Sequence, residues 1–246
     1  MAQIRLQGEE AALEEPTLVE GFPGIGLVGK IATDHLIDEF EMDYYASVHC
    51  DGLPRVGVYR KGDSTIRPPV RIYVDEDRDL LALQSDAPIA APAVGTVAEC
   101  LTSWLVETDV TPIFLSGFPA EKDGVPDLYG IATGDGADLL EAHDIATPSE
   151  DGVVSGPTGA LINRSAQLDR DSLGLVVESS PQFPDPEAAR VLIQKGIAPI
   201  TDLEVDVTDL VDRAEEIREQ REKLAERMQN LGEEESTQAQ PLRMYQ

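Results

Sequence analysis

The chain has 246 residues, 41% of them hydrophobic, and a formal net charge of −28. This length allows one large domain or two small ones, with roughly three quarters of the unfolded surface buried. The charge argues against a protein that binds nucleic acid or an anionic membrane surface, because both kinds of binding need clusters of Lys and Arg.

Several simple patterns bear on location and metal chemistry. No apolar run approaches the ~18 residues of a membrane span, and residues 1–15 are acidic and lack the basic-then-apolar pattern of a signal peptide. We therefore expect a cytoplasmic protein. Its acid-rich, lysine-poor composition suits concentrated salt, so we expect a halophilic source. Cys50 and Cys100 are isolated, which predicts two unpaired buried thiols and no metal site.

Strands and helices alternate along most of the chain. An apolar strand at residues 17–22 enters a glycine-dense corner, and Gly21-Phe22-Pro23 in this corner is echoed by Gly117-Phe118-Pro119. The echo suggests two corners at the same sheet edge. The other expected strands are residues 44–50, 55–59, 70–74, 80–84, 112–116, 128–133, 145–147 and 173–179. The expected helices are residues 27–40, 91–108, 137–143 and 186–195, and a further helix that follows a glycine-rich corner at 152–159 and ends at about Ala166. This alternation predicts a three-layer α/β domain.

The end of the chain differs from the rest. Residues 206–231 predict one long polar helix, with a seam of residues spaced alternately four and three apart. The seam consists of Leu210, Ala214, Ile217, Arg221, Leu224, Met228 and Leu231. Such a helix either packs on its own domain or associates between subunits as a coiled coil. We expect an α/β domain at residues 1–204, this helix at 205–231 and a flexible polar tail at 232–246.

The glycine corner raises two possible chemistries. Gly24, Gly26 and Gly29 match the dinucleotide fingerprint G-x-G-x-x-G, and Asp51 follows a strand from which it could meet a ribose hydroxyl. The phosphate-loop pattern fits as far as Lys30 but then has Ile31 where Ser or Thr should bind magnesium. The alternative is architectural, because glycines also permit a tight turn and close packing of helix on strand.

Other catalytic patterns are weak. The sequence has no G-x-S-x-G nucleophile elbow. The three histidines have no Ser or Cys at a convincing spacing. We expect His35 at the surface or half-buried, His49 in the core, and His143 at the end of a short helix. No catalytic residue, metal or cofactor is assigned.

Five segments together resemble the archaeal branch of the proteasome assembly chaperone 2 family. They are residues 20–29, 48–54, 80–88, 116–119 and 156–161, within a resemblance that covers about residues 17–203. The resemblance implies a three-layer αβα sandwich of the phosphorylase/hydrolase-like kind. It also implies a binding protein that associates with 20S proteasome α subunits, and archaeal relatives that form homo-oligomers.

The resemblance also suggests a function for the C-terminal tail. Met244, Tyr245 and Gln246 fit the hydrophobic-Tyr-any motif of proteasome activators and chaperones, which enters a pocket between adjacent α subunits. A tyrosine supplies a rigid anchor with a polar tip, and a terminal carboxylate supplies a charge. The leading hypothesis is thus a non-enzymatic proteasome-binding factor. The alternative is a nucleotide- or nucleoside-binding protein or enzyme that uses Gly21, Phe22, Pro23 and the fingerprint glycines.

Overall fold

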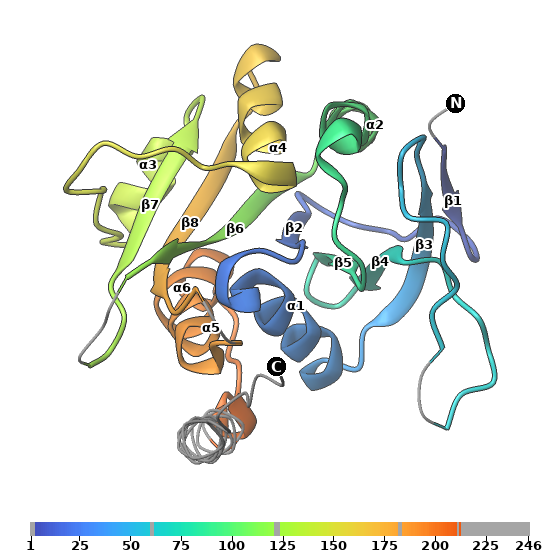
Figure 1. Cartoon of the computed structure of the whole chain (residues 1–246), viewed down its shortest axis with the longest axis horizontal. Helices are drawn as coiled ribbons and strands as arrows, with labels where there is room; N and C mark the ends of the chain where they lie inside the picture. The colour runs from blue at the N-terminus through green and yellow to red at the C-terminus, as the bar shows by residue number, and fades with distance from the viewer. Residues whose placement is uncertain (1–2, 60–61, 121–123, 182–183, 211, 213–246) are drawn as a thin grey trace, which may run out of the picture.

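The fold is built on one mixed sheet with helices on both faces (Figure 1). It is taken from a computed structural model that describes residues 3–59, 62–120, 124–181, 184–210 and 212. The strands are β1 Gln3–Leu6, β2 Thr17–Gly21, β3 Asp43–His49, β4 Val70–Asp75, β5 Leu80–Ser85, β6 Thr111–Pro119, β7 Leu128–Thr133 and β8 Ser172–Ser179. The helices are α1 Val28–Glu39, α2 Val94–Glu107, α3 Gly136–Ala142, α4 Gly156–Gln167, α5 Pro186–Leu192 and α6 Ala198–Thr201.

The sheet has a parallel centre and antiparallel flanks. Its order is β1-β3-β4-β5-β2-β6-β8-β7, and the pairs β5–β2, β2–β6 and β6–β8 are parallel. Thr17 of β2 lies opposite Leu80 of β5 on one side and Thr111 of β6 on the other. The carboxyl ends of these four central strands therefore lie along one edge of the sheet, where α/β proteins place their ligands.

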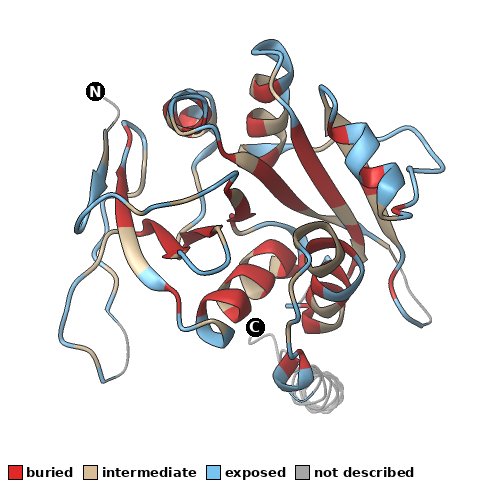
Figure 2. Ribbon diagram, turned by 180° about the vertical axis from the view of Figure 1, so that it is seen from behind, coloured by how far each residue is buried: buried red, intermediate tan, exposed pale blue. Residues whose placement is uncertain are grey.

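Alternating side chains of β2 supply the two halves of the core. Leu18 and Phe22 belong to the apolar cluster beneath α2 and α4, whereas Val19 belongs to the cluster beneath α1 and α5. Figure 2 shows the buried faces of these helices turned toward the sheet. The described residues thus form the predicted αβα layers, because a strand buried on both faces needs an apolar cover on each.

Two predicted strands are wrong. Residues 55–59 lie in a long loop. Among the residues that the structure describes, they form one isolated bridge, between Val58 and Arg67, and no strand lies beside them to extend it. Residues 145–147 form no strand, although the Gly130 N–H donates to the Ala146 carbonyl at 2.8 Å. In contrast, the hairpin of β4 and β5 is confirmed, with Val70 opposite Ser85.

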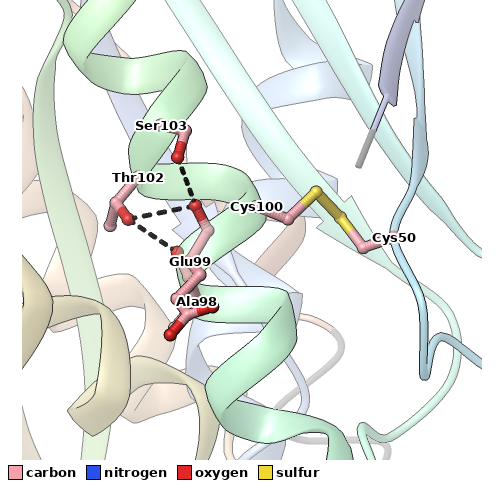
Figure 3. Close-up of a disulfide and its surroundings, with 6 residues drawn as sticks. All are labelled: Cys50, Ala98, Glu99, Cys100, Thr102 and Ser103. Atoms are coloured by element: carbon pink, nitrogen blue, oxygen red, sulfur yellow. Dashed lines mark hydrogen bonds between the residues drawn. A yellow bond between two sulfur atoms is a disulfide. The ribbon is translucent and has the colours of Figure 1, made fainter. Parts of the chain in front are cut away.

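The expectation of two unpaired thiols is also wrong. Cys50, just after β3, forms a disulfide with Cys100 of α2, and their Cα atoms are 6.2 Å apart (Figure 3). The two residues are 50 positions apart in the chain. The fold brings α2 close to the end of β3, and this brings the two cysteines together. The sequence near either cysteine does not predict the pairing.

The first turn of the predicted C-terminal helix packs on the α/β body. Val207 and Leu210 are buried in the cluster beneath α1 and α5, and Leu210 is the first residue of the predicted seam. The remainder of that seam and the tail lie outside the described residues. Within the described residues, no helix has the length and apolar character needed to cross a membrane.

Candidate functional site at the carboxyl edge of the sheet

The glycine corner joins β2 to α1 through one short turn. β2 ends at Gly21, a short 3₁₀ turn spans Ile25–Leu27, and α1 begins at Val28. Gly26 has φ +62°, and Leu27, which precedes α1, has φ +52°. A left-handed conformation is unstrained for Gly26 and unfavourable for Leu27, so the corner holds one strained residue.

Protein atoms fill the space beside Gly26 and Gly117, whereas none lies within 4 Å of the position of a Cβ on Gly24. A Cβ on Gly26 would lie 1.9 Å from Ser179 Oγ, and the Asp185 N–H donates to the Gly26 carbonyl at 2.8 Å. A Cβ on Gly117, at the end of β6, would lie 2.5 Å from the Ile25 carbonyl oxygen. The two Gly-Phe-Pro segments therefore lie at one sheet edge. The prediction of two corners is wrong for the second segment, because Gly117, Phe118 and Pro119 are still part of β6 and pair with β8. The glycines serve close packing between the ends of β2, β6 and β8.

The remaining elements of a nucleotide site are not brought together. β3 is separated from β2 by β4 and β5, so Asp51 is about 14 Å away along the sheet, at roughly 4.8 Å per strand. The Lys30 ammonium is paired with Asp34 at 2.8 Å and with Asp86 at 3.0 Å. These contacts favour the architectural interpretation of the corner, and ligand binding there stays a prediction.

A buried carboxyl group lies next to the corner. Glu20 of β2 is fully buried and accepts hydrogen bonds from the Phe22 N–H at 2.7 Å, the Leu115 N–H at 3.3 Å and Thr158 Oγ1 of α4 at 3.1 Å. Burial raises the pKa of Glu20 to about 7, and the three hydrogen bonds partly offset this effect. Glu20 thus joins β2 to β6 and to the first turn of α4.

A second polar cluster lies at the carboxyl end of β5. Arg71 of β4 is fully buried and donates to the Pro68 carbonyl at 2.6 Å, as well as to the side chains of Gln84 and Asp86. Burial alone would raise the pKa of Asp86, but hydrogen bonds from Arg71 and Lys30 hold it below its ordinary value. With Asp34, the cluster has two cations and two anions, so its charges are balanced.

The histidines only partly follow the predictions. His35 is buried rather than at the surface, with Nε2 2.6 Å from the Asp206 carbonyl oxygen, because the chain after α6 covers it. His49 is exposed rather than in the core, because it is the last residue of β3. Its Nε2 lies 3.0 Å from Ser47 Oγ. His143 follows α3 directly, as predicted. Within the described part of the chain, no group of three or more His, Cys, Asp or Glu residues could hold a metal ion.

Neither polar cluster coincides with a functional motif in the sequence. Their signal is a polar residue inside an apolar strand, namely Glu20 after Leu18-Val19, Arg71 between Val70 and Ile72, and Gln84 after Leu83. Glu20, Thr158, Gln84 and Asp86 also belong to the segments that carry the family resemblance. The structure therefore brings separate resemblance segments into direct contact. Met244, Tyr245 and Gln246 lie outside the described residues.

Comparisons with known proteins agree with this architecture. The PAC2 family model matches residues 18–225. An uncharacterized protein of Methanocaldococcus jannaschii is 29% identical over 215 residues, which cover 87% of each chain. The crystal structure of Pyrococcus furiosus PbaA, described as an archaeal homolog of proteasome-assembly chaperone, has a TM-score of 0.78 and 25% identity, covering 94% of this chain and 99% of that one.

Pyrococcus furiosus PbaB, described as an archaeal proteasome activator, is equally similar. Its crystal structure has a TM-score of 0.78 and 25% identity, and the match covers 91% of this chain and 98% of that one. The family match spans most of the chain and includes both polar clusters as well as the glycine corner. The chain therefore belongs to the PAC2 family.

Proposed function

We propose that this protein binds the 20S proteasome and acts as an assembly chaperone or activator, not as an enzyme. The observation that carries the proposal is its likeness to PbaA and PbaB over more than 90% of each chain. The packing at Gly26 supports it, because Ser179 and Asp185 occupy the space through which a phosphate would approach that glycine.

We assign proteasome docking to Met244, Tyr245 and Gln246. In this proposal Tyr245 enters a pocket between adjacent α subunits, and the terminal carboxylate pairs with a cationic side chain there. Tyrosine suits such a pocket because its ring buries a large apolar area with little loss of rotamer freedom. About ten flexible residues before the motif would span very roughly 15–20 Å, enough to reach across part of a ring.

The proposal includes self-association in a cytoplasm of high salt. Several tails on one homo-oligomer would bind one α ring with avidity, which raises the apparent affinity without any new contact. A charge of −28 on each copy opposes such assembly in dilute buffer and is screened within ~3 Å at molar salt.

Co-purification with 20S proteasome in high salt tests the docking mechanism. We expect deletion of residues 244–246, or Tyr245→Ala, to abolish binding and leave thermal unfolding unchanged. Tyr245→Phe keeps the ring and tests the hydroxyl, and Gln240→Ala is the matched control within the tail. Unchanged binding by the deletion variant would reject the tail mechanism.

The nucleotide hypothesis is tested on the same protein. A thermal-shift screen with nucleotides and nucleosides in high salt should give no stabilisation if the corner is architectural. Stabilisation by one compound that disappears in Gly24→Val would favour a ligand site instead. Gly24 suits this test because no protein atom lies within 4 Å of the position of its added Cβ.

A further inference from the structure

Four segments of this acidic chain contain no charged residue. They are residues 21–29, 87–98, 110–120 and 152–163. Charged residues make up 27% of the chain, so a segment of this length would ordinarily hold about three of them. The whole net charge of −28 therefore comes from the rest of the chain.

The fold brings these four segments to the carboxyl edge of the sheet. The first and third contain the ends of β2 and β6, where a Cβ on Gly117 would lie 2.5 Å from the Ile25 carbonyl oxygen. The second follows β5, which pairs with β2 (Figure 1). The fourth contains the first turn of α4, where Thr158 Oγ1 donates to Glu20 at 3.1 Å. Segments that are far apart in the sequence thus form one uncharged edge.

The exposed part of this edge is apolar. Phe118 and Ile25 have exposed fractions of 47% and 36%. The charged groups of the two polar clusters beside them are buried or paired, as described above for Glu20 and Lys30. Apolar side chains gathered on an uncharged surface are typical of the centre of an interface. We call the exposed residues of this edge the carboxyl-edge face, and they are Gly24, Ile25, Pro88, Ala91, Phe118 and Pro119.

The charge distribution indicates what covers this face. Each copy of the chain carries a charge of −28, so two copies repel one another in most relative orientations. A two-fold contact places the same patch of both copies together. An uncharged apolar patch is complementary to itself, whereas an acidic patch is not. A basic partner would instead be attracted to the acidic remainder of the surface. The carboxyl-edge face is therefore where two copies meet with the least repulsion.

We propose that the carboxyl-edge face is covered by the same face of a second copy of this chain. The assignment rests on the self-association proposed above and does not require proteasome binding. These residues supply only part of the ~800 Å² per partner of a stable interface, so they form its centre. Polar residues around them form its rim, among them Glu178, which lies opposite Phe118 on β8. Phe118 is the apolar anchor of the contact.

Sedimentation of the full chain in high salt, over a wide range of concentrations and without proteasome, tests the proposal. Phe118→Ser should raise the dissociation constant of the oligomer by at least ~10-fold, the effect of truncating an interface anchor. Val106→Ser is the matched control, because Val106 is 43% exposed on α2 and lies outside the face. Circular dichroism and thermal unfolding must show that each variant is folded.

An added charge tests the electrostatic argument separately from the apolar area. Ala91→Glu brings one uncompensated carboxylate from each copy into the contact. It should weaken self-association by at least ~10-fold, and more at moderate than at molar salt, because salt screens the repulsion. Ala91→Gln has nearly the same size without the charge and should have a smaller effect. Ala137→Glu adds the same charge at an exposed position in the first turn of α3 and should leave self-association unchanged.

The outcomes separate this proposal from proteasome docking. A wild-type chain that stays monomeric overturns the proposal, as do Phe118→Ser and Ala91→Glu variants that assemble like wild type. Equal weakening by Ala137→Glu also overturns it, because the position of the charge would then not matter. Face variants that assemble normally but lose proteasome binding overturn it as well, because the face would then contact the proteasome. Normal assembly of the chain that lacks residues 244–246, together with weakened assembly of the face variants, supports it.

Discussion

Glu20 gives a quantitative test of the buried cluster at the carboxyl edge. The unfolded chain releases the Glu20 proton near the ordinary pKa of 4.5, whereas the folded chain holds it up to about pH 7. Between these values the folded state binds more protons than the unfolded state, so stability falls as pH rises. The difference corresponds to about 3 kcal/mol of unfolding free energy, present below pH 4.5 and lost by pH 8.

Replacing Glu20 by Gln removes this dependence without changing the side-chain shape. The amide oxygen can accept from the Phe22 or the Leu115 N–H, and a hydrogen bond lost at the other costs about 1–3 kcal/mol at every pH. Relative to wild type, the Glu20→Gln variant should therefore gain about 3 kcal/mol between pH 4.5 and pH 8.

Urea unfolding at several pH values and constant salt measures this gain. Other carboxylates contribute equally to both proteins and cancel in the difference. Glu141→Gln, an exposed change on α3, is the matched control and should give a curve parallel to wild type. If the Glu20→Gln curve is also parallel to wild type, Glu20 is ionised in the folded protein across this range and the account of its burial is refuted.

Two further substitutions probe the packing of the same edge. Gly26→Ala should destabilise the fold by at least ~2 kcal/mol, because φ is +62° and the new methyl group would lie 1.9 Å from Ser179 Oγ. Asp86→Ala leaves the buried Arg71 guanidinium without its carboxylate and should cost about 3–5 kcal/mol. Both losses are measured by chemical unfolding in high salt.

Each of these has a control within the chain. Gly24→Ala should be nearly neutral, because Gly24 has extended backbone with φ −135° and open space beside it. Arg170→Ala breaks the exposed ion pair with Asp109, 2.9 Å long, and should cost less than about 1 kcal/mol. A neutral Gly26→Ala would contradict the packing account of the corner, and a neutral Asp86→Ala would show that Arg71 is stabilised by its other partners.

The layered core could be predicted from apolar periodicity, because each core strand or helix corresponds to an apolar segment of the length typical for that element. Residues 70–74 alternate, a charged turn follows, and the apolar residues 80–83 return, and these segments form the predicted hairpin. The segment at 55–59 has the same Val and Tyr content and fails as a strand. Composition alone cannot say whether a neighbouring strand will be present.

Contacts between residues far apart in the sequence limit how much of the candidate site can be predicted. Cys50 and Cys100, or Glu20 and Thr158, meet only after the strand order is fixed, and 138 positions separate the latter pair. Burial of His35 likewise depends on the segment at Asp206, 171 positions away. The spacing of neighbouring residues in the sequence does not predict these contacts. The polar residue inside an apolar strand is the one local sign that such a partner must exist.

The glycine corner was the strongest local motif, and its surroundings give it a structural role. Gly26 and Gly117 let the ends of three central strands approach closely, while Glu20 ties two of them to α4. A family can share such an arrangement because it holds the sheet edge together, whatever each member binds. Differences in partner must then reside in segments outside the packed edge, and the proposed docking residues Met244, Tyr245 and Gln246 belong to such a segment.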